Sequence, residues 1–229
     1  LLEAAVEPEG PAEQVAAVVR IASRFGVPLW TTSQGRNFGY GGAEARVEGS
    51  IALSLRRMNR VLEVNTELGY AVVEPGATFF DLYEAIKGTG LWLSCPDLGR
   101  GSVLGNALDH GVGYTPYGDH TAQLCGLEVV LPSGEILRTG TGGITGSPNW
   151  HAHKRGFGPS LDGLFAQSNF GIVTRAGVWL MPEPECYAPG GVMVEHESDL
   201  APLVDTLRPL LLDGTIQGYP LIVHAFGPV

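Results

Sequence analysis

The spacing of hydrophobic residues near the start of the chain predicts a helix followed by a strand. In Pro11–Phe25, valine and alanine side chains recur every three or four positions, Pro11 suits a first helical turn, and Gly26 suits the stop. The apolar run Val27–Thr32 then predicts a short buried strand. It leads into the glycine loop Gln34–Gly42 (QGRNFGYGG), and loops that follow strands are the usual place for a nucleotide.

Three short apolar or β-branched runs come next and are separated by turn-like or charged residues. They predict sheet strands at Ser50–Leu55, Val61–Asn65 and Tyr70–Glu74. Thr78–Ile86 (TFFDLYEAI) predicts a helix, because Thr78 is a favourable cap, the first turn is acidic and the apolar positions have helical spacing.

The second half of the chain alternates strand patterns with irregular segments. Leu124–Leu131 and Glu135–Thr139 flank a Pro-Ser-Gly turn and predict a hairpin. Residues 139–158 are glycine-rich and irregular, Ser160–Phe165 predicts a short helix, and Gly171–Met181 (GIVTRAGVWLM) predicts a strong strand. Strands and helices alternate without a strict β–α–β rhythm, which favours an α+β fold.

The composition changes after Pro182 and Pro184, where a domain boundary is expected. We therefore assign 1–184 to a first domain and 185–229 to a second unit. In that unit, Gly190–Val194 predicts a strand and Glu197–Leu212 a helix. The chain stops within an apolar run, so the second unit is expected to be cut.

The longest irregular stretch, Ser94–His120 (SCPDLGRGSVLGNALDHGVGYTPYGDH), is rich in glycine and carries acids. No single helix or strand accommodates it. Glycine permits positive φ and lets the backbone approach a ligand, while free N–H groups can donate to a phosphate or a ring oxygen. Together with Gln34–Gly42, it predicts two loops that flank one elongated ligand.

Charge and composition narrow the function. The 229 residues are 44% hydrophobic and 17% charged, as in a globular protein, and the 33 glycines show no fixed period. A net charge of −10 repels a phosphate backbone, which argues against nucleic acid as a partner. A single pyrophosphate, held by backbone N–H groups with Arg36 or Arg100, fits this charge better.

Metal and membrane functions are not predicted. Cys95, Cys125 and Cys186 lack the spacing of a disulfide framework or a zinc site. The acid and histidine pairs of the glycine loops, and the pair His151 and His153, have no further ligands at metal-binding spacing.

No stretch approaches 18 apolar residues, so a soluble protein is expected, with the cytoplasm and the periplasm both open. The first residues lack a signal-peptide pattern, but without an initial Met a removed leader stays open.

Six motifs, in this order, resemble the vanillyl-alcohol oxidase and p-cresol methylhydroxylase family of FAD-dependent enzymes: QGRNFGYGG, PDLGRGSVLGN, GVGYTPYGDH, GFGPSLDGLF, QSNFGIVT and WLMP. The resemblance covers about Pro11 to Pro184. It implies a two-part α+β FAD-binding domain of the p-cresol methylhydroxylase type, followed by the start of an α+β substrate cap domain. It also implies that other parts of a longer protein supply further substrate contacts and any covalent flavin link, since the first glycine loop contains no histidine.

The resemblance implies that the two glycine loops form two walls of an FAD site. The first wall would present backbone donors and one cation to the pyrophosphate, from Gln34, Gly35, Arg36, Asn37, Phe38 and Gly39. The second wall would comprise Pro96, Leu98, Gly101, Ser102, Gly105 and Asn106. Further contacts would come from Gly113, Tyr114, Tyr117, Gly118 and Asp119, and backbone contacts from Gly171, Ile172 and Val173.

Two residues stand where the family has catalytic groups. Tyr40 matches a phenol-binding tyrosine that holds the substrate as phenolate. Asp97 matches an acid of the oxidase branch, near the flavin N5 and the reacting carbon, where a carboxylate stabilises positive charge or acts as a base toward water. From the residues alone, a packing tyrosine, a turn-forming aspartate and structural glycine turns stay open as alternatives.

The resemblance therefore implies an enzyme in which FAD takes hydride from the benzylic carbon of a para-substituted phenol, of the 4-alkylphenol, vanillyl alcohol or eugenol type. The resulting quinone methide is resolved by water or by rearrangement. Electrons would pass to oxygen or to a cytochrome partner, and the protein would be a homodimer or larger. An FAD oxidoreductase for a 2-hydroxy acid or a sugar, and a non-catalytic FAD-binding module, stay open as alternatives.

Overall fold

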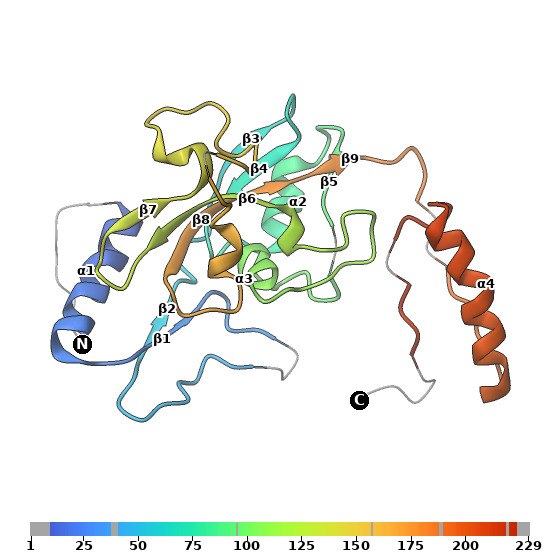
Figure 1. Cartoon of the computed structure of the whole chain (residues 1–229), viewed down its shortest axis with the longest axis horizontal. Coiled ribbons are helices and arrows are strands. Elements are labelled where there is room, and N and C mark those ends of the chain that lie inside the picture. Colours follow the sequence, from blue (N-terminus) through green and yellow to red (C-terminus); the bar gives the residue numbers. More distant parts are fainter. Residues whose placement is uncertain are drawn as a thin grey trace.

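The computed structural model describes residues 10–37, 41–94, 96–156, 158–187, 190–218 and 220–223. Figure 1 shows a central antiparallel sheet with helices packed against it, a smaller parallel strand pair beside it, and a C-terminal helix set to one side. The predicted mixture of helices and sheets is confirmed.

Helix α1 (Pro11–Phe25) begins and ends where the sequence predicts. Gly26 closes it at φ +63°, a left-handed conformation that glycine adopts without a Cβ penalty, and its N–H bonds back to the last turn. The buried face of α1 packs onto a small core cluster formed by Val15, Ala16, Val19, Leu55 and Val130. This cluster joins the first elements of the chain to the central sheet.

Strands β1 (Leu29–Thr32) and β2 (Ile51–Ser54) form a parallel pair. The segment that connects them, 33–50, contains the first glycine loop. Parallel neighbours cannot be joined by a tight turn, so this long connection is required by the pairing itself.

Five strands form the central sheet, in the order β3-β4-β8-β6-β7, and every neighbouring pair is antiparallel. Their bounds are β3 Val61–Asn65, β4 Tyr70–Val73, β6 Leu124–Val130, β7 Ile136–Arg138 and β8 Ile172–Trp179. The strands predicted at 70–74 and 124–131 form, and all residues of β4 and β6 are buried, whereas β1, expected to be a buried strand, has no buried residue.

Two helices pack on one face of this sheet and complete the main core. Helix α2 (Phe79–Ile86) buries Phe79, Leu82 and Ile86. Helix α3 (Val103–Leu108) lies inside the glycine-rich stretch 94–120, for which no helix was predicted, and it buries Val103, Leu104 and Ala107. These side chains meet Val73 of β4 and Leu127, Val129 and Ala176 of β6 and β8. The long glycine-rich stretch is therefore anchored to the core at its centre.

A capping box fixes the start of α2. The Thr78 hydroxyl accepts from the Asp81 N–H at 3.1 Å, and Asp81 Oδ2 accepts from the Thr78 N–H at 2.9 Å. Such a cap typically stabilises a helix by about 1 kcal/mol. Thr78 also forms an antiparallel bridge with Ser102, so the cap lies beside the second glycine loop.

The remaining elements are short or exposed. Strands β5 (Leu91–Trp92) and β9 (Met181–Pro182) form a two-stranded pair. Single 3-10 turns occur at Thr121–Gln123, Gly140–Gly143, Asp162–Phe165 and Glu197–Asp199. The helix expected at Ser160–Phe165 is thus only one such turn.

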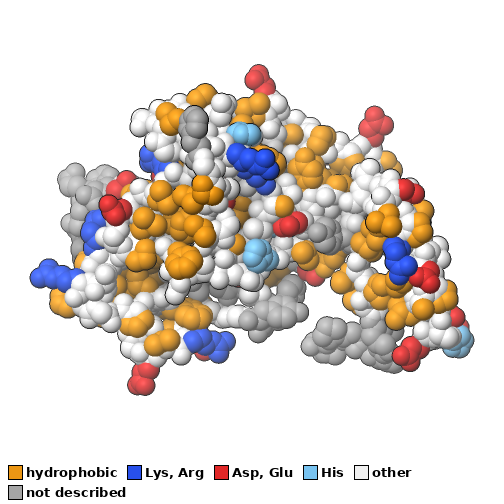
Figure 2. Space-filling model, viewed as in Figure 1, with side chains coloured by type: hydrophobic (Ala, Val, Ile, Leu, Met, Phe, Trp, Pro, Cys, Tyr) orange, Lys and Arg blue, Asp and Glu red, His pale blue; other side chains and the backbone are white. Residues whose placement is uncertain are grey.

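The C-terminal part corrects one expectation. No strand forms at 190–194, where the side chains are exposed, Met193 by 86%. A strand needs a partner edge for its backbone groups, and no described strand lies alongside this segment. Helix α4 (Leu200–Leu212) does form, with no buried residue, and Figure 2 shows hydrophobic side chains exposed over it. The domain boundary near Pro184 stays a prediction.

Candidate cofactor and substrate site

The first glycine loop is tied at its start to the loop that follows β4. The side-chain amide of Gln34 is buried and donates to the Gly76 carbonyl at 2.5 Å, and Arg56 donates to the Gln34 carbonyl at 2.8 Å. Gly35 has φ +64°, and a Cβ there would stand 2.9 Å from the Cβ of Ala43. Position 35 therefore requires glycine for both conformation and space.

Beyond this anchor, the loop offers unused donors. Within the described part of the chain, the backbone N–H groups of Gly35, Arg36 and Asn37 have no hydrogen-bond partner. Arg36 and Asn37 are exposed. Free N–H groups beside a cation suit an anion. The next three predicted site residues, Phe38, Gly39 and Tyr40, lie outside the described residues.

The second wall, formed by the loop and helix around Gly101–Asn106, presents fewer free backbone donors than expected. The N–H groups of Gly101, Gly105 and Asn106 already donate to Leu98 O at 2.8 Å, Ser102 Oγ at 2.8 Å and Ser102 O at 3.0 Å. The Ser102 hydroxyl in turn donates to the buried carbonyl of Pro75 at 2.5 Å. These three backbone donors are thus already bonded within the protein and are not free for a ligand.

The two walls meet where α3 passes the end of β1. A Cβ on Gly105 would overlap the hydroxyl of Ser33, which immediately precedes Gln34. The absence of a side chain at Gly105 lets the backbones of the two glycine loops lie side by side. This contact therefore brings the two distant segments together, as expected for loops that flank one site.

Asp97 and Tyr114 lie together at the edge of this region. The Tyr114 hydroxyl donates to Asp97 Oδ2 at 3.0 Å; Asp97 is exposed and Tyr114 half-buried. Burial, and then the hydrogen bond and charge of Asp97, raise the pKa of Tyr114, so the phenol remains a donor at neutral pH. Pro96 and Leu98, on either side of Asp97, are half-buried.

A buried histidine behind this pair is the feature that sequence reasoning missed. His120 Nδ1 contacts Asn106 Oδ1, and Nε2 lies 2.9 Å from Ser94 Oγ. Ser94 Oγ also accepts from Thr115 Oγ1 at 3.0 Å. Asn106, predicted as a cofactor contact, thus directs its side-chain oxygen to His120. The only sequence signal was a histidine at the end of a glycine-rich stretch.

The loop that carries Tyr114 is closed on itself. Gly113 N–H donates to Gly118 O at 2.8 Å, and both glycines are buried. The exposed Asp119 accepts from the Ala122 N–H at 2.9 Å, while Tyr117 is half-buried. Gly113, Gly118 and Asp119 therefore shape the loop through internal bonds.

The last predicted contacts are at the start of β8. A Cβ on Gly171 would stand 3.0 Å from the Val130 carbonyl, so this residue must be small. Val173 packs in the main core and Ile172 against the α1 cluster. On one side, Ile172 and Val173 pair with β6. On the other side, β8 pairs with β4 only from Ala176 onward, so the backbone of Ile172 and Val173 is not bonded to β4. The expected backbone contacts require such an edge.

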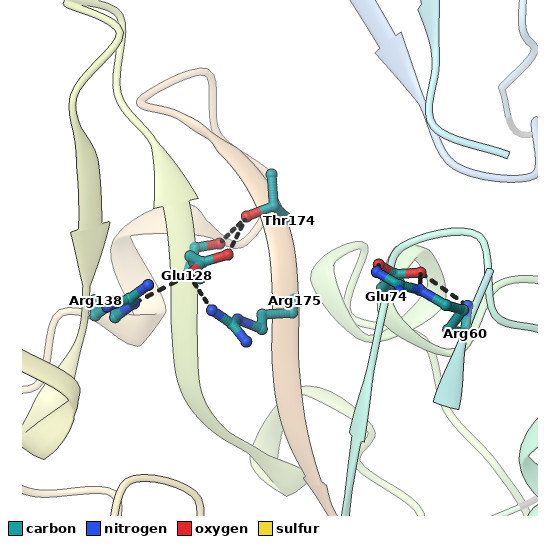
Figure 3. Close-up of polar contacts among 6 residues, drawn as sticks. All are labelled: Arg60, Glu74, Glu128, Arg138, Thr174 and Arg175. Carbon is teal, nitrogen blue, oxygen red and sulfur yellow. Dashed lines mark hydrogen bonds and ion pairs between the residues drawn. The ribbon is translucent and has the colours of Figure 1, made fainter. Parts of the chain in front are cut away.

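Two ion-pair clusters, shown in Figure 3, hold the sheet in place. The buried carboxylate of Glu74 bonds Arg60 at 2.7 Å, directly before the turn that carries Gly76. Glu128 bonds Arg138 at 3.0 Å and Arg175 at 2.5 Å, and accepts from Thr174 at 3.1 Å. Neither cluster was predicted, because each joins residues on, or directly next to, different strands.

Within the described residues, no helix combines the length and the apolarity needed to cross a bilayer. The same residues hold no group of three or more His, Cys, Asp or Glu side chains arranged as a metal site requires.

The glycine walls, the free donors of the first loop and the two-part α+β architecture define an FAD-binding domain. The chain belongs to the FAD binding domain family, whose pattern matches residues 3–140. The predicted cofactor, FAD, is thereby confirmed.

Comparisons with individual proteins confirm the predicted resemblance to p-cresol methylhydroxylase and its relatives. The chain is 47% identical over 214 residues to the 4-cresol dehydrogenase (hydroxylating) flavoprotein subunit of Pseudomonas putida, covering 92% of this chain and 41% of the relative. It superposes on a crystal structure of p-cresol methylhydroxylase with substrate bound, with a TM-score of 0.88 and 45% identity over 92% of this chain and 41% of that one.

It also superposes on the 4-ethylphenol oxidase from Gulosibacter chungangensis in its isoeugenol complex, with a TM-score of 0.82 and 50% identity. That match covers 88% of this chain and 39% of the oxidase. The predicted fold class is thus confirmed. The chain spans about two fifths of the length of these relatives.

The described residues fit FAD. The first loop supplies unpaired N–H groups and the Arg36 cation for a pyrophosphate, while the wall at Gly101–Asn106 is preformed by its own hydrogen bonds. Gly105 adds no side chain where the two walls meet, so the Ser33 hydroxyl occupies the space that a Cβ would need. This arrangement suits a long, flat, anionic cofactor.

Proposed function

We propose that the complete protein oxidises para-substituted phenols of the 4-alkylphenol, vanillyl alcohol or eugenol type. The observation that carries the proposal is the 47% identity to 4-cresol dehydrogenase, supported by the likeness to 4-ethylphenol oxidase. FAD, when bound, supplies the acceptor for a hydride that leaves the benzylic carbon of the phenol. The phenolate oxygen supplies electron density to the ring, and a quinone methide results.

Asp97 is proposed as the residue that faces the developing positive charge. Its carboxylate accepts a hydrogen bond from Tyr114 at 3.0 Å and is open to solvent on the other side. A carboxylate fixed in this way stabilises positive charge at the benzylic carbon, and it accepts a proton when water adds to the quinone methide. Tyr40, proposed to bind the phenolate oxygen, lies outside the described residues.

The cofactor-binding roles divide between the two walls. Gln34, Gly35, Arg36, Asn37, Phe38 and Gly39 are proposed to bind the pyrophosphate through N–H groups and one cation. The second wall, with Pro96, Leu98, Gly101, Ser102, Gly105 and Asn106, is proposed to support the flavin. Gly113, Tyr114, Tyr117, Gly118, Asp119, Gly171, Ile172 and Val173 are proposed as flanking contacts.

The electron acceptor and the assembly belong to the same proposal. Molecular oxygen and a cytochrome are both candidates, because relatives named as an oxidase and as a dehydrogenase flavoprotein subunit match the chain about equally well. A homodimer or a larger assembly is proposed for the complete protein. Residues 185–229 are proposed to begin a substrate cap domain.

Anaerobic flavin reduction tests the function. The complete protein, loaded with FAD, is mixed with 4-ethylphenol, with D-lactate or with a sugar, and flavin absorbance near 450 nm is followed by stopped flow. We expect bleaching with the phenol alone. Bleaching by the hydroxy acid or the sugar would favour the alternative oxidoreductase, and bound but unreduced FAD would favour a binding module. Reoxidation by air against reoxidation by cytochrome c then identifies the acceptor.

A further inference from the structure

His120 lies in a buried position behind the candidate site. It directly precedes the turn Thr121–Gln123, is 5% exposed, and packs its ring against Phe79 with centroids 5.5 Å apart. One ring nitrogen faces Asn106 Oδ1 of α3, and the other faces Ser94 Oγ of the segment that precedes Asp97. A histidine in this position is fully committed to internal partners.

The partners determine the tautomer. The Asn106 Oδ1 atom only accepts, so Nδ1 of His120 carries the proton and Nε2 is the acceptor. Ser94 must then donate its hydroxyl proton to Nε2, which leaves its oxygen free to accept from Thr115 Oγ1 at 3.0 Å. Burial lowers the pKa of His120 to about 4, against a smaller raising effect of Asp119, so the ring is neutral at neutral pH.

The chain of bonds ends on the two loops that carry Asp97 and Tyr114. Ser94 lies three positions before Asp97, and Thr115 directly follows Tyr114. We infer that His120 is a positioning residue that, through Ser94 and Thr115, holds these two loops in register and so sets the contact between Asp97 and Tyr114. The inference rests on the proposed function for its kinetic consequence, but its geometric consequence is independent of any reaction.

A different reading of the same side chains is a nucleophilic triad, because Ser94, His120 and Asn106 are the groups that such a triad uses. The space beside them argues against it. The cavity lined by Ser94 and His120 is about 20 Å³, with apolar walls that include Leu82, Leu93 and Val178. That volume admits about one water molecule, so an acyl substrate does not reach Ser94.

The direct test is a crystal structure of the complete protein carrying His120→Phe. Phenylalanine retains the ring packing against Phe79 but makes no hydrogen bond. We expect the distance from Tyr114 Oη to Asp97 Oδ2 to increase beyond hydrogen-bonding range, about 3.5 Å. An unchanged distance would overturn the inference, whether or not the protein oxidises phenols. Should the variant fail to fold, Ser94→Ala removes the hydroxyl that bonds both His120 and Thr115, and the same distance is measured in that variant.

The kinetic test uses a double-mutant cycle on anaerobic flavin reduction. His120→Phe is expected to lower the reduction rate about tenfold while FAD content and phenol affinity change less than about threefold. In an Asp97→Ala background, the same change is expected to have almost no further effect, because a residue that acts through Asp97 has nothing left to position. Equal effects in both backgrounds would identify a merely structural role and contradict the inference.

His153→Gln provides the matched control, since His153 is exposed and lies outside the site. Anaerobic flavin reduction in this variant should proceed at the wild-type rate. If the wild-type protein oxidises no phenol at all, the proposed function fails, and the crystallographic distance alone then decides the role of His120.

Discussion

Gly105 in α3 lies against Ser33 at the end of β1 so closely that a single added methyl group would overlap the serine hydroxyl. This contact joins two segments that are far apart in sequence and that are proposed to form the two walls of the FAD site. The walls have their spacing because one of the two residues has no side chain.

We therefore predict that Gly105→Ala separates the walls. The variant should lose FAD affinity at least tenfold, because the pyrophosphate loop and the second wall no longer meet. Bound flavin after gel filtration, and its dissociation constant by fluorescence, measure this. Adding Ser33→Gly removes the overlapping hydroxyl and should restore most of the binding. If the double variant binds FAD no better than the single one, the overlap is not the cause.

The second prediction concerns Glu128, whose side chain is 5% exposed and bonds Arg138, Arg175 and Thr174. Glu128→Gln should lower the free energy of unfolding by about 1–2 kcal/mol at pH 7, since it removes the charge that pairs with two partly exposed guanidinium groups. Urea unfolding measures the loss. Glu84→Gln, which breaks an exposed pair with Lys87, is the control and should cost less than about 0.5 kcal/mol.

The effect of Glu128 should depend on pH. Burial by itself would raise the pKa of Glu128, but the hydrogen bonds and charges of Arg175 and then Arg138 outweigh it and lower the pKa below its ordinary value. A lowered carboxyl pKa adds stability above the unfolded-state value, and that stability is lost as the pH falls through the folded value. The difference between wild type and Glu128→Gln should thus be largest above pH 5 and shrink toward pH 3. A difference that grows on acidification would contradict this assignment.

The third prediction concerns the reaction. Asp97→Ala in the complete protein should lower the rate of anaerobic flavin reduction by a 4-alkylphenol about a hundredfold, equivalent to about 2.7 kcal/mol, with little change in FAD content. The reason is that the carboxylate is proposed to face the reacting carbon and not the pyrophosphate. Asp205→Asn, at an exposed ion pair on α4, is the control. Normal reduction together with lost FAD would show that Asp97 is a loop residue.

The fourth prediction concerns two thiols. Cys125 is completely buried, and burial is the main cause that raises its pKa to about 12, whereas Cys186 is exposed. Because the thiolate is the reactive form, iodoacetamide at pH 8 should alkylate Cys186 within minutes and leave Cys125 unmodified. Peptide mass mapping distinguishes the two sites. Labelling of Cys125 should appear only when urea unfolds the domain, and early labelling would mean that β6 opens locally.

The sequence by itself determined the elements whose signals are local. Helix α1 follows from the spacing of its valines between Pro11 and Gly26, and α2 from Thr78 and the acidic first turn. The strands at 61–65, 70–74 and 124–131 follow from their apolar runs. The same local reasoning failed at 190–194, because an apolar run becomes a strand only when another strand lies beside it.

The tertiary structure alone decided which residues meet. Asn106, His120 and Ser94 form one hydrogen-bonded line although they come from three separate parts of the glycine-rich stretch, and Glu128 meets Arg175 only because β6 and β8 are neighbours. Local propensity fixes backbone conformation within a few residues. Contacts between distant residues depend instead on strand order and on close packing, such as that of Gly105 against Ser33, and these are properties of the whole folded chain.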